Sequence, residues 1–450
     1  MNLRRLAGLC LMGLALDGAA RAEDAENRPI PDAVATTQVL TLAEALRAAR
    51  AHQPTLELAR GTLVTDEGLA NQNRASLLPQ LSGTASYTRA TSNFVPQPGG
   101  TVPNGSQAAS SSFATTPLWR VGLSANQLIY DFGETINRWK SARVAADAAA
   151  ESVHITEAQV DYNARVAFFT ARADKDLVGV ARDTLANQEK HLGQVQGYVE
   201  VGTHPEIDLT QARADRATAQ LQLINAENAY SVAKAVLNQA MGVERSIEYD
   251  LSDEELPPVL GEDGNVETLV DEAKHLRPEM VNLRLNSRSQ ELGLRSAHDM
   301  IWPNLGANGS VNESGPALDR TTWNFAGMIA LSVPLLQGGA INAQIKEAQG
   351  QVVQANAQLE VERQQVRLDV EQARLGIRAA KGAIAAAEDA LANTRDRLRL
   401  AEGRYSTGVG NIIELGDAQL ALTTTAAEKV QAQYQLYTAR AQLLKALGRN

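Results

Sequence analysis

The sequence repeats itself, and this repeat limits the possible folds more than any other feature. Displaced by 206 positions, the stretch 127–242 aligns with the second half of the chain without a gap. Gly133 then lies on Gly339, and Gly242 lies on Gly448. Because an internal repeat means that one structural unit occurs more than once, we expect the chain to fold as two similar units.

The upstream part of each copy follows a different displacement. Residues 41–60 match residues 265–284, with Pro54 on Pro278, at an offset of 224. The difference between the offsets, 224 minus 206, gives the first copy 18 additional residues. They fall within 92–116, a segment rich in Ser, Gly and Pro with few apolar residues. Such a composition is typical of a surface loop.

Each copy contains the same order of predicted elements. A helical segment opens it, over 41–76 in the first copy and 266–300 in the second. Two segments with a loose alternation of apolar and polar residues follow, which is the weak signal that membrane strands give. These strand-like segments are residues 80–90 and 118–130 in the first copy, and 304–314 and 322–333 in the second.

Long helices follow the strands. Residues 134–198 contain no proline, and neither do residues 335–450. A helix over the 65 residues of 134–198 would be roughly 95 Å long and must pack along its side. Its apolar positions are mostly Ala, Val and Leu, which allow helices to approach closely. Short turns at 199–205 and 405–411 then precede returning helices. Each copy is therefore predicted to be a helical hairpin joined to a strand hairpin.

The N-terminal segment has the pattern of an export signal. Arg4 and Arg5 precede the apolar run 6–16, and the sequence ARA at 20–22 fits a cleavage site. The apolar run is too short to span a bilayer. We therefore expect residues 1–22 to be a signal peptide that directs the chain across the inner membrane.

Composition excludes several classes of protein. Aromatic residues make up only 4% of the chain, which argues against a conventional sheet enzyme, and the net charge of −10 argues against nucleic acid as a partner. The only cysteine, Cys10, lies within the signal, and the bulky Leu9 before it disfavours a lipid anchor. No later stretch reaches 18 apolar residues, so a membrane span would have to use strands.

We find no arrangement of residues that predicts chemistry. The six histidines are scattered, and no phosphate-binding loop, nucleophile elbow or catalytic triad is evident. We therefore expect no enzyme activity, no metal site and no cofactor.

Four strands cannot close on themselves, and open strand edges are not tolerated in lipid. Three chains would supply twelve strands, with twelve long helices beneath them. At this point the chain resembles the TolC-type outer-membrane efflux proteins, the exit ducts of tripartite drug-efflux and type I secretion systems. The residues that carry this resemblance are "LAEALRAARAHQP", "QLIYDFG", "VPLLQGG" and "YSTGVGNIIELGDAQ" together with its earlier twin.

The resemblance implies an α+β fold in which long helical hairpins form a trimeric α-barrel, joined to a twelve-stranded trimeric β-barrel in the outer membrane. Each chain would give four strands. The first repeat would cover 23–242 and the second 266–450, with a linker at 243–265 in the equatorial region. The loop at 92–116 would be extracellular, and the helical tunnel would extend into the periplasm.

The resemblance also implies a function and partners. A homotrimer in outer-membrane lipid would passively conduct drugs or polypeptides, supplied by a periplasmic adaptor and an inner-membrane pump of the RND, ABC or MFS class. A periplasmic adaptor or scaffold built on a helical hairpin is the alternative. Adaptors carry one hairpin, however, whereas this chain carries two matched ones.

The second turn would lie at the periplasmic mouth of the tunnel. Glu414 and Asp417 are three residues apart, so one helix face presents both, and threefold symmetry would bring six carboxylates around the pore. Arg404 and Tyr405 occupy positions where the family has gate contacts. The best-known members carry an arginine where this chain has Gly410. The other interpretation is a solvated turn whose acids favour a helix N-terminus.

The first turn supplies the equivalent positions. Asp208 aligns with Glu414, and we expect it to lie further from the axis or to help the neighbouring hairpin hold the gate shut. Gly202, Gly408 and Gly410 should keep the turns pliable, because glycine adopts backbone conformations that other residues avoid.

Overall fold

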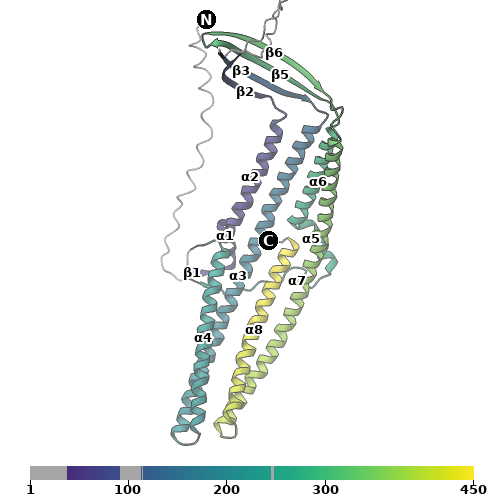
Figure 1. Cartoon of the computed structure of the whole chain (residues 1–450). Helices are drawn as coiled ribbons and strands as arrows, with labels where there is room; N and C mark the ends of the chain where they lie inside the picture. Colours follow the sequence, from purple (N-terminus) through teal and green to yellow (C-terminus); the bar gives the residue numbers. More distant parts are fainter. Residues whose placement is uncertain (1–37, 92–112, 114, 245–247, 450) are drawn as a thin grey trace, which may run out of the picture.

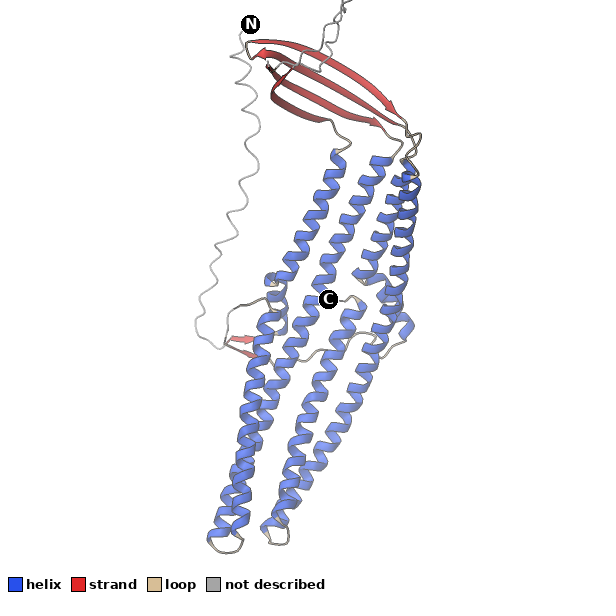
Figure 2. Ribbon diagram, viewed as in Figure 1, coloured by secondary structure: helices blue, strands red, loops and turns tan. Residues whose placement is uncertain are grey.

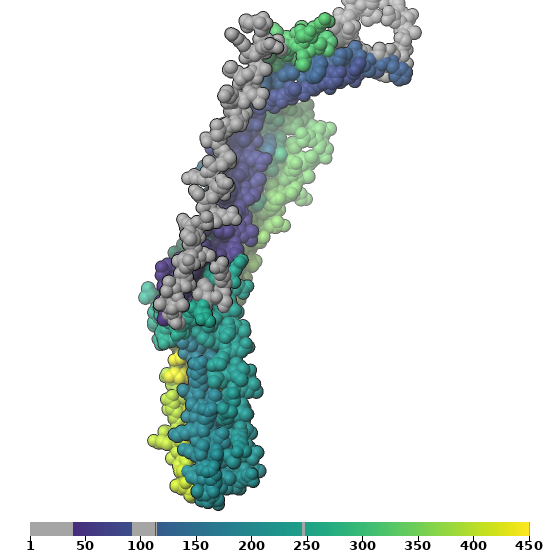
Figure 3. All heavy atoms as spheres, turned by 90° about the vertical axis from the view of Figure 1, so that its left-hand side faces the viewer, coloured from purple at the N-terminus to yellow at the C-terminus, as the bar shows by residue number. Residues whose placement is uncertain are grey.

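The computed structural model describes residues 38–91, 113, 115–244 and 248–449. The predicted signal peptide at 1–22 and most of the predicted loop at 92–116 lie outside these residues. The described chain is an elongated set of helices with a small sheet at one end (Figures 1 and 2). In the side view the molecule is narrow and bent, and the sheet projects sideways (Figure 3).

The two halves of the chain have the same order of long elements. The first half contains β1 (Gln38–Leu40), α1 (Leu42–His52), α2 (Pro54–Ala75), β2 (Gln80–Thr91), β3 (Thr115–Tyr130), α3 (Glu134–Glu200) and α4 (Glu206–Ala240). The second contains β4 (Tyr249–Leu251), α5 (Val266–Leu276), α6 (Pro278–Asp299), β5 (Asn304–Ala317), β6 (Arg320–Ser332), α7 (Ala340–Ser406) and α8 (Ile412–Leu447). The predicted helical hairpins are confirmed, and α3 and α7 have 67 residues each.

The predicted strand hairpins are also confirmed. They form one antiparallel sheet with the order β2-β3-β5-β6, so β3 and β5 join the two halves of the chain. β2 and β6 are its edges. The short strands β1 and β4 pair in parallel halfway along the helices (Figure 2).

The prediction of one uninterrupted helix over 41–76 and another over 266–300 was wrong. Each is broken into two helices just before a proline. Gln53 has φ −71° and ψ 116°, and Arg277 has φ −66° and ψ 126°, which are extended conformations. The proline ring disfavours helical geometry in the residue before it, yet suits the first position of a new helix. Pro54 and Pro278 therefore end one helix and begin the next.

Small side chains let the long helices pack closely. α3 lies between α4 and α8, and α7 lies beside α8 (Figure 1). Ala171 of α3 and Ala441 of α8 are fully buried in the cluster that these helices share. Halfway along, Phe168 and Phe169 of α3 form a wider core with Leu237 of α4. The short helices α1 and α5 are held at this level, against α3 and α7.

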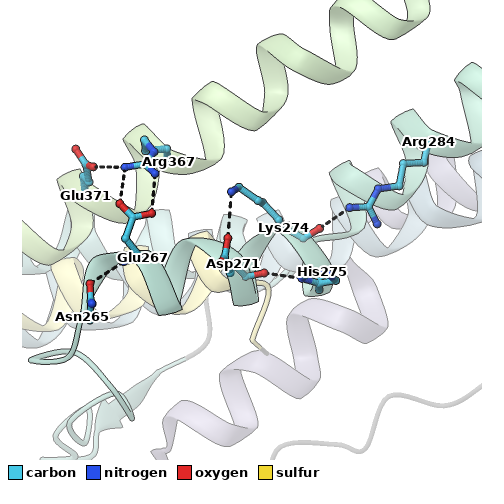
Figure 4. Close-up of polar contacts among 8 residues, drawn as sticks. All are labelled: Asn265, Glu267, Asp271, Lys274, His275, Arg284, Arg367 and Glu371. Atoms are coloured by element: carbon cyan, nitrogen blue, oxygen red, sulfur yellow. Dashed lines mark hydrogen bonds and ion pairs between the residues drawn. The ribbon is translucent and has the colours of Figure 1, made fainter.

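Ion pairs fasten the two short helices to the long ones. In the first half, Arg50 of α1 donates from Nε to Asp161 of α3 at 2.8 Å, and the Asp161 side chain is fully buried. In the second half, Arg367 of α7 donates to both carboxylate oxygens of Glu267 of α5, at 2.9 and 2.7 Å (Figure 4). Arg367 and Glu267 are both substantially exposed.

The segment between the two halves of the chain is anchored at the same level, halfway along the long helices. Its Glu262 is almost fully buried and accepts hydrogen bonds from two nitrogens of Arg440, both at 3.1 Å. Burial opposes ionisation of Glu262, but hydrogen bonds from Arg440, Lys381 and the Val259 amide lower its pKa to about 2. The carboxylate thus ties this segment to α8. Within the described residues, no helix has the length and apolar character that crossing a membrane requires.

Candidate functional site at the hairpin tips

The two helical turns have similar backbones. Gly202, with φ 76°, follows α3, and Gly408, with φ 74°, follows α7. Few residues other than glycine adopt this left-handed conformation without strain. Gly410 is restricted in another way, because a Cβ there would approach Arg404 Cβ and the Tyr405 nitrogen to 3.0 Å. Any side chain at position 410 would have to displace the end of α7.

The two turns lie at the same end of the molecule (Figure 2), and the hairpins pack against each other there. A buried apolar cluster joins them, and it consists of Val195, Ala212, Leu398, Ala401, Tyr405, Leu415 and Ala418. Since α3, α4, α7 and α8 all contribute, parting the hairpins at this end would expose apolar surface to water.

A buried hydrogen bond crosses from one hairpin to the other. The Tyr405 hydroxyl of α7 donates to Asp208 Oδ2 of α4 at 3.3 Å. Tyr405 is 3% exposed and Asp208 is 9% exposed. Burial, together with the nearby Asp208 charge, raises the pKa of Tyr405 to about 12, so its proton is held firmly. Two residues that the sequence singled out for separate reasons are thus brought into contact.

Three aromatic side chains that the sequence analysis missed complete this cluster. The His204 ring lies against Tyr198 with centroids 5.0 Å apart, and its Nδ1 is 3.3 Å from Asp208 Oδ2. His191 meets the Tyr405 ring at 5.5 Å, and burial lowers the pKa of His191. His204 precedes Asp208 by four residues, which was the one signal in the sequence that the two could meet.

The predicted acids of the second turn lie in different surroundings. Glu414 Oε1 is 3.3 Å from Arg404 Nε, across the turn, and both side chains are substantially exposed. The Glu414 amide donates to the side chain of Asn411, which caps α8. Asp417, one turn further along, instead lines a groove between the hairpins. The structure therefore places Arg404 beside Glu414, and Tyr405 beside Asp208.

In the part of the chain that the structure describes, no group of three or more His, Cys, Asp or Glu side chains is arranged to hold a metal ion. The site offers instead a buried contact between the hairpins and two solvated carboxylates, Glu414 and Asp417, near the start of α8.

Comparisons with known proteins add to this geometry. A model of the family described as outer membrane efflux protein matches residues 37–243 and 269–449. The outer membrane efflux protein BepC of Brucella suis is 23% identical over 295 residues, which are 65% of this chain and 59% of that protein. The chain thus spans less than two thirds of the length of this curated relative.

Solved structures share the fold. The CmeC outer membrane channel of Campylobacter jejuni superposes with a TM-score of 0.78 at 16% identity, covering 90% of this chain and 85% of that one. The outer membrane protein VceC of Vibrio cholerae gives a TM-score of 0.77 at 19% identity, covering 91% and 96%. The likeness therefore extends over both hairpins and the sheet.

Proposed function

The chain belongs to the family of outer membrane efflux proteins, and from this premise we propose that it is a passive exit duct in the outer membrane. As a homotrimer it would receive drugs or polypeptides from a periplasmic adaptor and an inner-membrane pump of the RND, ABC or MFS class. The family is one of channels rather than enzymes. A periplasmic adaptor is the less suitable alternative, because this chain carries two matched helical hairpins.

The incomplete sheet is the observation that carries this proposal. The larger sheet of a single chain has four strands, and its two edges are β2 and β6. On β6 the alternate residues Trp323, Phe325, Ile329 and Leu331 are 64% to 76% exposed, so one face of that strand is apolar. Lipid would cover such a face, and two further chains would pair with the free edges.

The length of the helices supports the periplasmic part of the proposal. At 1.5 Å per residue, the 67 residues of α3 and of α7 extend about 100 Å. They run away from the sheet, so the hairpin tips lie far from the membrane (Figure 1). The tips would therefore form the periplasmic mouth and meet the adaptor.

At that mouth we assign two roles. The buried Tyr405–Asp208 contact would hold the two hairpins of each chain together and keep the mouth narrow. The carboxylates of Glu414 and Asp417 would give the opening its preference for cations, since like charges gathered around one axis attract counter-ions.

The oligomer provides the first test. Purified in mild detergent, the protein should have the mass of three chains, because three four-stranded sheets supply the twelve strands expected for the barrel. A monomer or a dimer would contradict the proposal.

Topology provides the second test. An epitope inserted between Leu318 and Asp319, in the β5–β6 turn, should be accessible to antibody on intact cells. The matched insertion between Gly202 and Thr203, at the other end of the molecule, should become accessible only after the outer membrane is permeabilised. Equal access to both insertions on intact cells would refute the arrangement.

A further inference from the structure

His191 of α3 lies inside the contact between the two hairpin tips. It is 6% exposed, and its ring meets that of Tyr405 of α7 edge-on, with centroids 5.5 Å apart. Val195, one turn further along α3, is fully buried in the apolar cluster that joins the hairpins. Part of what encloses the His191 ring therefore belongs to the other hairpin.

His191 lacks the partners that would stabilise its charged form. Within the described residues it makes no hydrogen bond and no ion pair. His154 of the same helix is largely exposed instead, and its Nδ1 lies 3.1 Å from Glu157 Oε2. Burial lowers the pKa of His191, although the charges of Asp215 and Asp208 oppose this effect. The closed arrangement of the tips therefore favours a neutral ring.

The titratable groups that face His191 come from α4 and α7. Asp208 and Asp215 of α4 act on it through their charge, and Tyr405 of α7 meets its ring. α8 contributes apolar side chains, such as Leu415, to the neighbouring cluster. The pKa of Tyr405 is raised to about 12, and carboxylates ordinarily titrate at about pH 4. Histidine side chains are therefore the groups whose charge changes near neutral pH.

The other histidine of the tips, His204, does not hold the hairpins together. Its Nδ1 lies 3.3 Å from Asp208 Oδ2, which belongs to the same hairpin. The same Oδ2 accepts the hydrogen bond of Tyr405 from the other hairpin. Proton uptake by His204 would strengthen the contact within the first hairpin, because hydrogen bonds between charged groups are the stronger ones. It would not oppose the parting of the tips.

We propose that His191 is a proton-operated switch that parts the tips of the two hairpins when the surroundings become acidic. A ring that is enclosed when the tips are closed binds a proton more weakly than a ring in water, so proton binding favours the parted state. The closed state holds fewer protons, and the ratio of parted to closed tips should rise as the pH falls below about 6.5, the ordinary histidine pKa. This inference rests on the proposed duct, because parted tips would open its periplasmic mouth.

The distance between spin labels on the two turns tests the proposal. Val201 and Val409 are 73% and 72% exposed, so labelled cysteines can replace them without loss of packing, in a chain that carries Cys10→Ser. With labelled chains diluted by unlabelled ones, double electron–electron resonance measures the distance within one chain. From pH 7.5 to pH 5.5 the ratio of the longer to the shorter distance should rise roughly three- to tenfold. His191→Phe and His191→Gln cannot take up a proton and should show the same distances at both pH values.

His154→Gln is the matched control, because it removes an exposed histidine in the half of α3 nearer the sheet. It should respond to acid as the unaltered protein does, and His204→Gln should keep most of the response. A response that persists in both His191 variants, or that disappears in His204→Gln or His154→Gln, overturns the proposal. An unchanged distance in the unaltered protein overturns it as well.

The spin labels report on the tips whether or not the protein conducts ions. If planar bilayers show no conduction but the tips still part in acid through His191, the duct proposal fails and the switch stands. If the protein conducts but the tips do not respond to acid, the switch fails and the duct stands.

Discussion

The two copies of the repeat place equivalent charged residues in opposite surroundings. Asp161 of the first copy is fully buried, whereas the aligned Arg367 of the second is 46% exposed at its side chain. Asp208 of the first copy is buried under Tyr405, whereas the aligned Glu414 is 43% exposed and meets only Arg404 across its own turn. In both comparisons the first copy uses a buried acid to hold elements together, and the second leaves its charge at the surface.

This difference indicates a division of labour between copies of one unit. Buried ion pairs cost desolvation, and removing one partner leaves the other charge uncompensated. Exposed pairs contribute little to stability but remain free to interact with ions and partners. At these two positions a buried acid anchors the first hairpin. We expect the tip of the second hairpin, with its exposed charges, to be the part that faces permeating ions.

The two copies should differ most in how strongly the loss of one acidic side chain destabilises the protein. Asp161→Ala removes the buried acceptor of Arg50. It also leaves Arg165, whose pKa is lowered by burial, without the nearby negative charge of Asp161 that favours its charged form. We expect a loss of about 3–5 kcal/mol in the free energy of unfolding. Glu267→Ala, in the corresponding clamp of the second copy, should have a much smaller effect. Thermal unfolding in detergent measures both, and equal shifts would break the comparison.

Lowering the pH should cost more stability through the buried carboxylate of Glu262, which lies between the two copies, than through an exposed carboxylate. The folded-state pKa of Glu262 is lowered from 4.5 to about 2, so its contribution to stability is complete above pH 4.5 and is lost as the pH falls towards 2. The stability difference between the unaltered protein and Glu262→Gln should therefore shrink over that interval. Denaturant unfolding from pH 6 to pH 2.5 checks this expectation.

The exposed Glu267 gives the control for this experiment. Its pKa is also lowered, mainly by the hydrogen bonds from Arg367, but water screens the pair. Glu267→Gln should keep most of the acid sensitivity of the unaltered protein. If the free energy of unfolding of Glu262→Gln and of Glu267→Gln depends on pH in the same way, the expected effect of burial is contradicted.

The second tip should affect ions without affecting the fold. Replacing Glu414 and Asp417 by Ala removes two substantially solvated acids, so the unfolding midpoint and the trimer should stay unchanged. In planar bilayers we expect a weaker preference for cations and less block by divalent ions. Asp208→Ala should do the reverse and change stability more than selectivity. If the variant that lacks Glu414 and Asp417 keeps the selectivity of the unaltered protein, these acids do not act on ions and only favour the N-terminus of α8.

Much of the fold was accessible from the sequence because it rests on periodic features. The repeat placed Gly202 and Gly408 at equivalent turns, and long stretches without proline predicted α3 and α7 closely. The repeat aligns Pro54 with Pro278, but the apolar periodicity continues through both and so does not reveal the helix breaks. The breaks follow from the effect of a proline on the residue before it, which marks both positions as helix boundaries.

The contacts at the tips were accessible only in part. Glu414 and Asp208 were found through the repeat, but the contact between Asp208 and Tyr405 joins residues 197 positions apart. Such a contact depends on the angle at which two hairpins pack, and no local pattern encodes that angle.

The central claim is that the Tyr405–Asp208 contact holds the tips of the two hairpins together. Single-channel recordings of Tyr405→Phe, Asp208→Ala and the double variant test it most directly. Losing one hydrogen bond of about 1 kcal/mol should raise the ratio of open to closed states roughly fivefold. Because both substitutions remove the same bond, the double variant should exceed either single variant only slightly.

Tyr434→Phe is the control for this measurement, since the Tyr434 hydroxyl lies 2.8 Å from that of Thr170, away from the tips. The contact between Tyr405 and Asp208 predicts that Tyr405→Phe and Asp208→Ala open the channel, while Tyr434→Phe conducts like the unaltered protein. If Tyr405→Phe and Asp208→Ala open as rarely as the unaltered protein, the claim is contradicted.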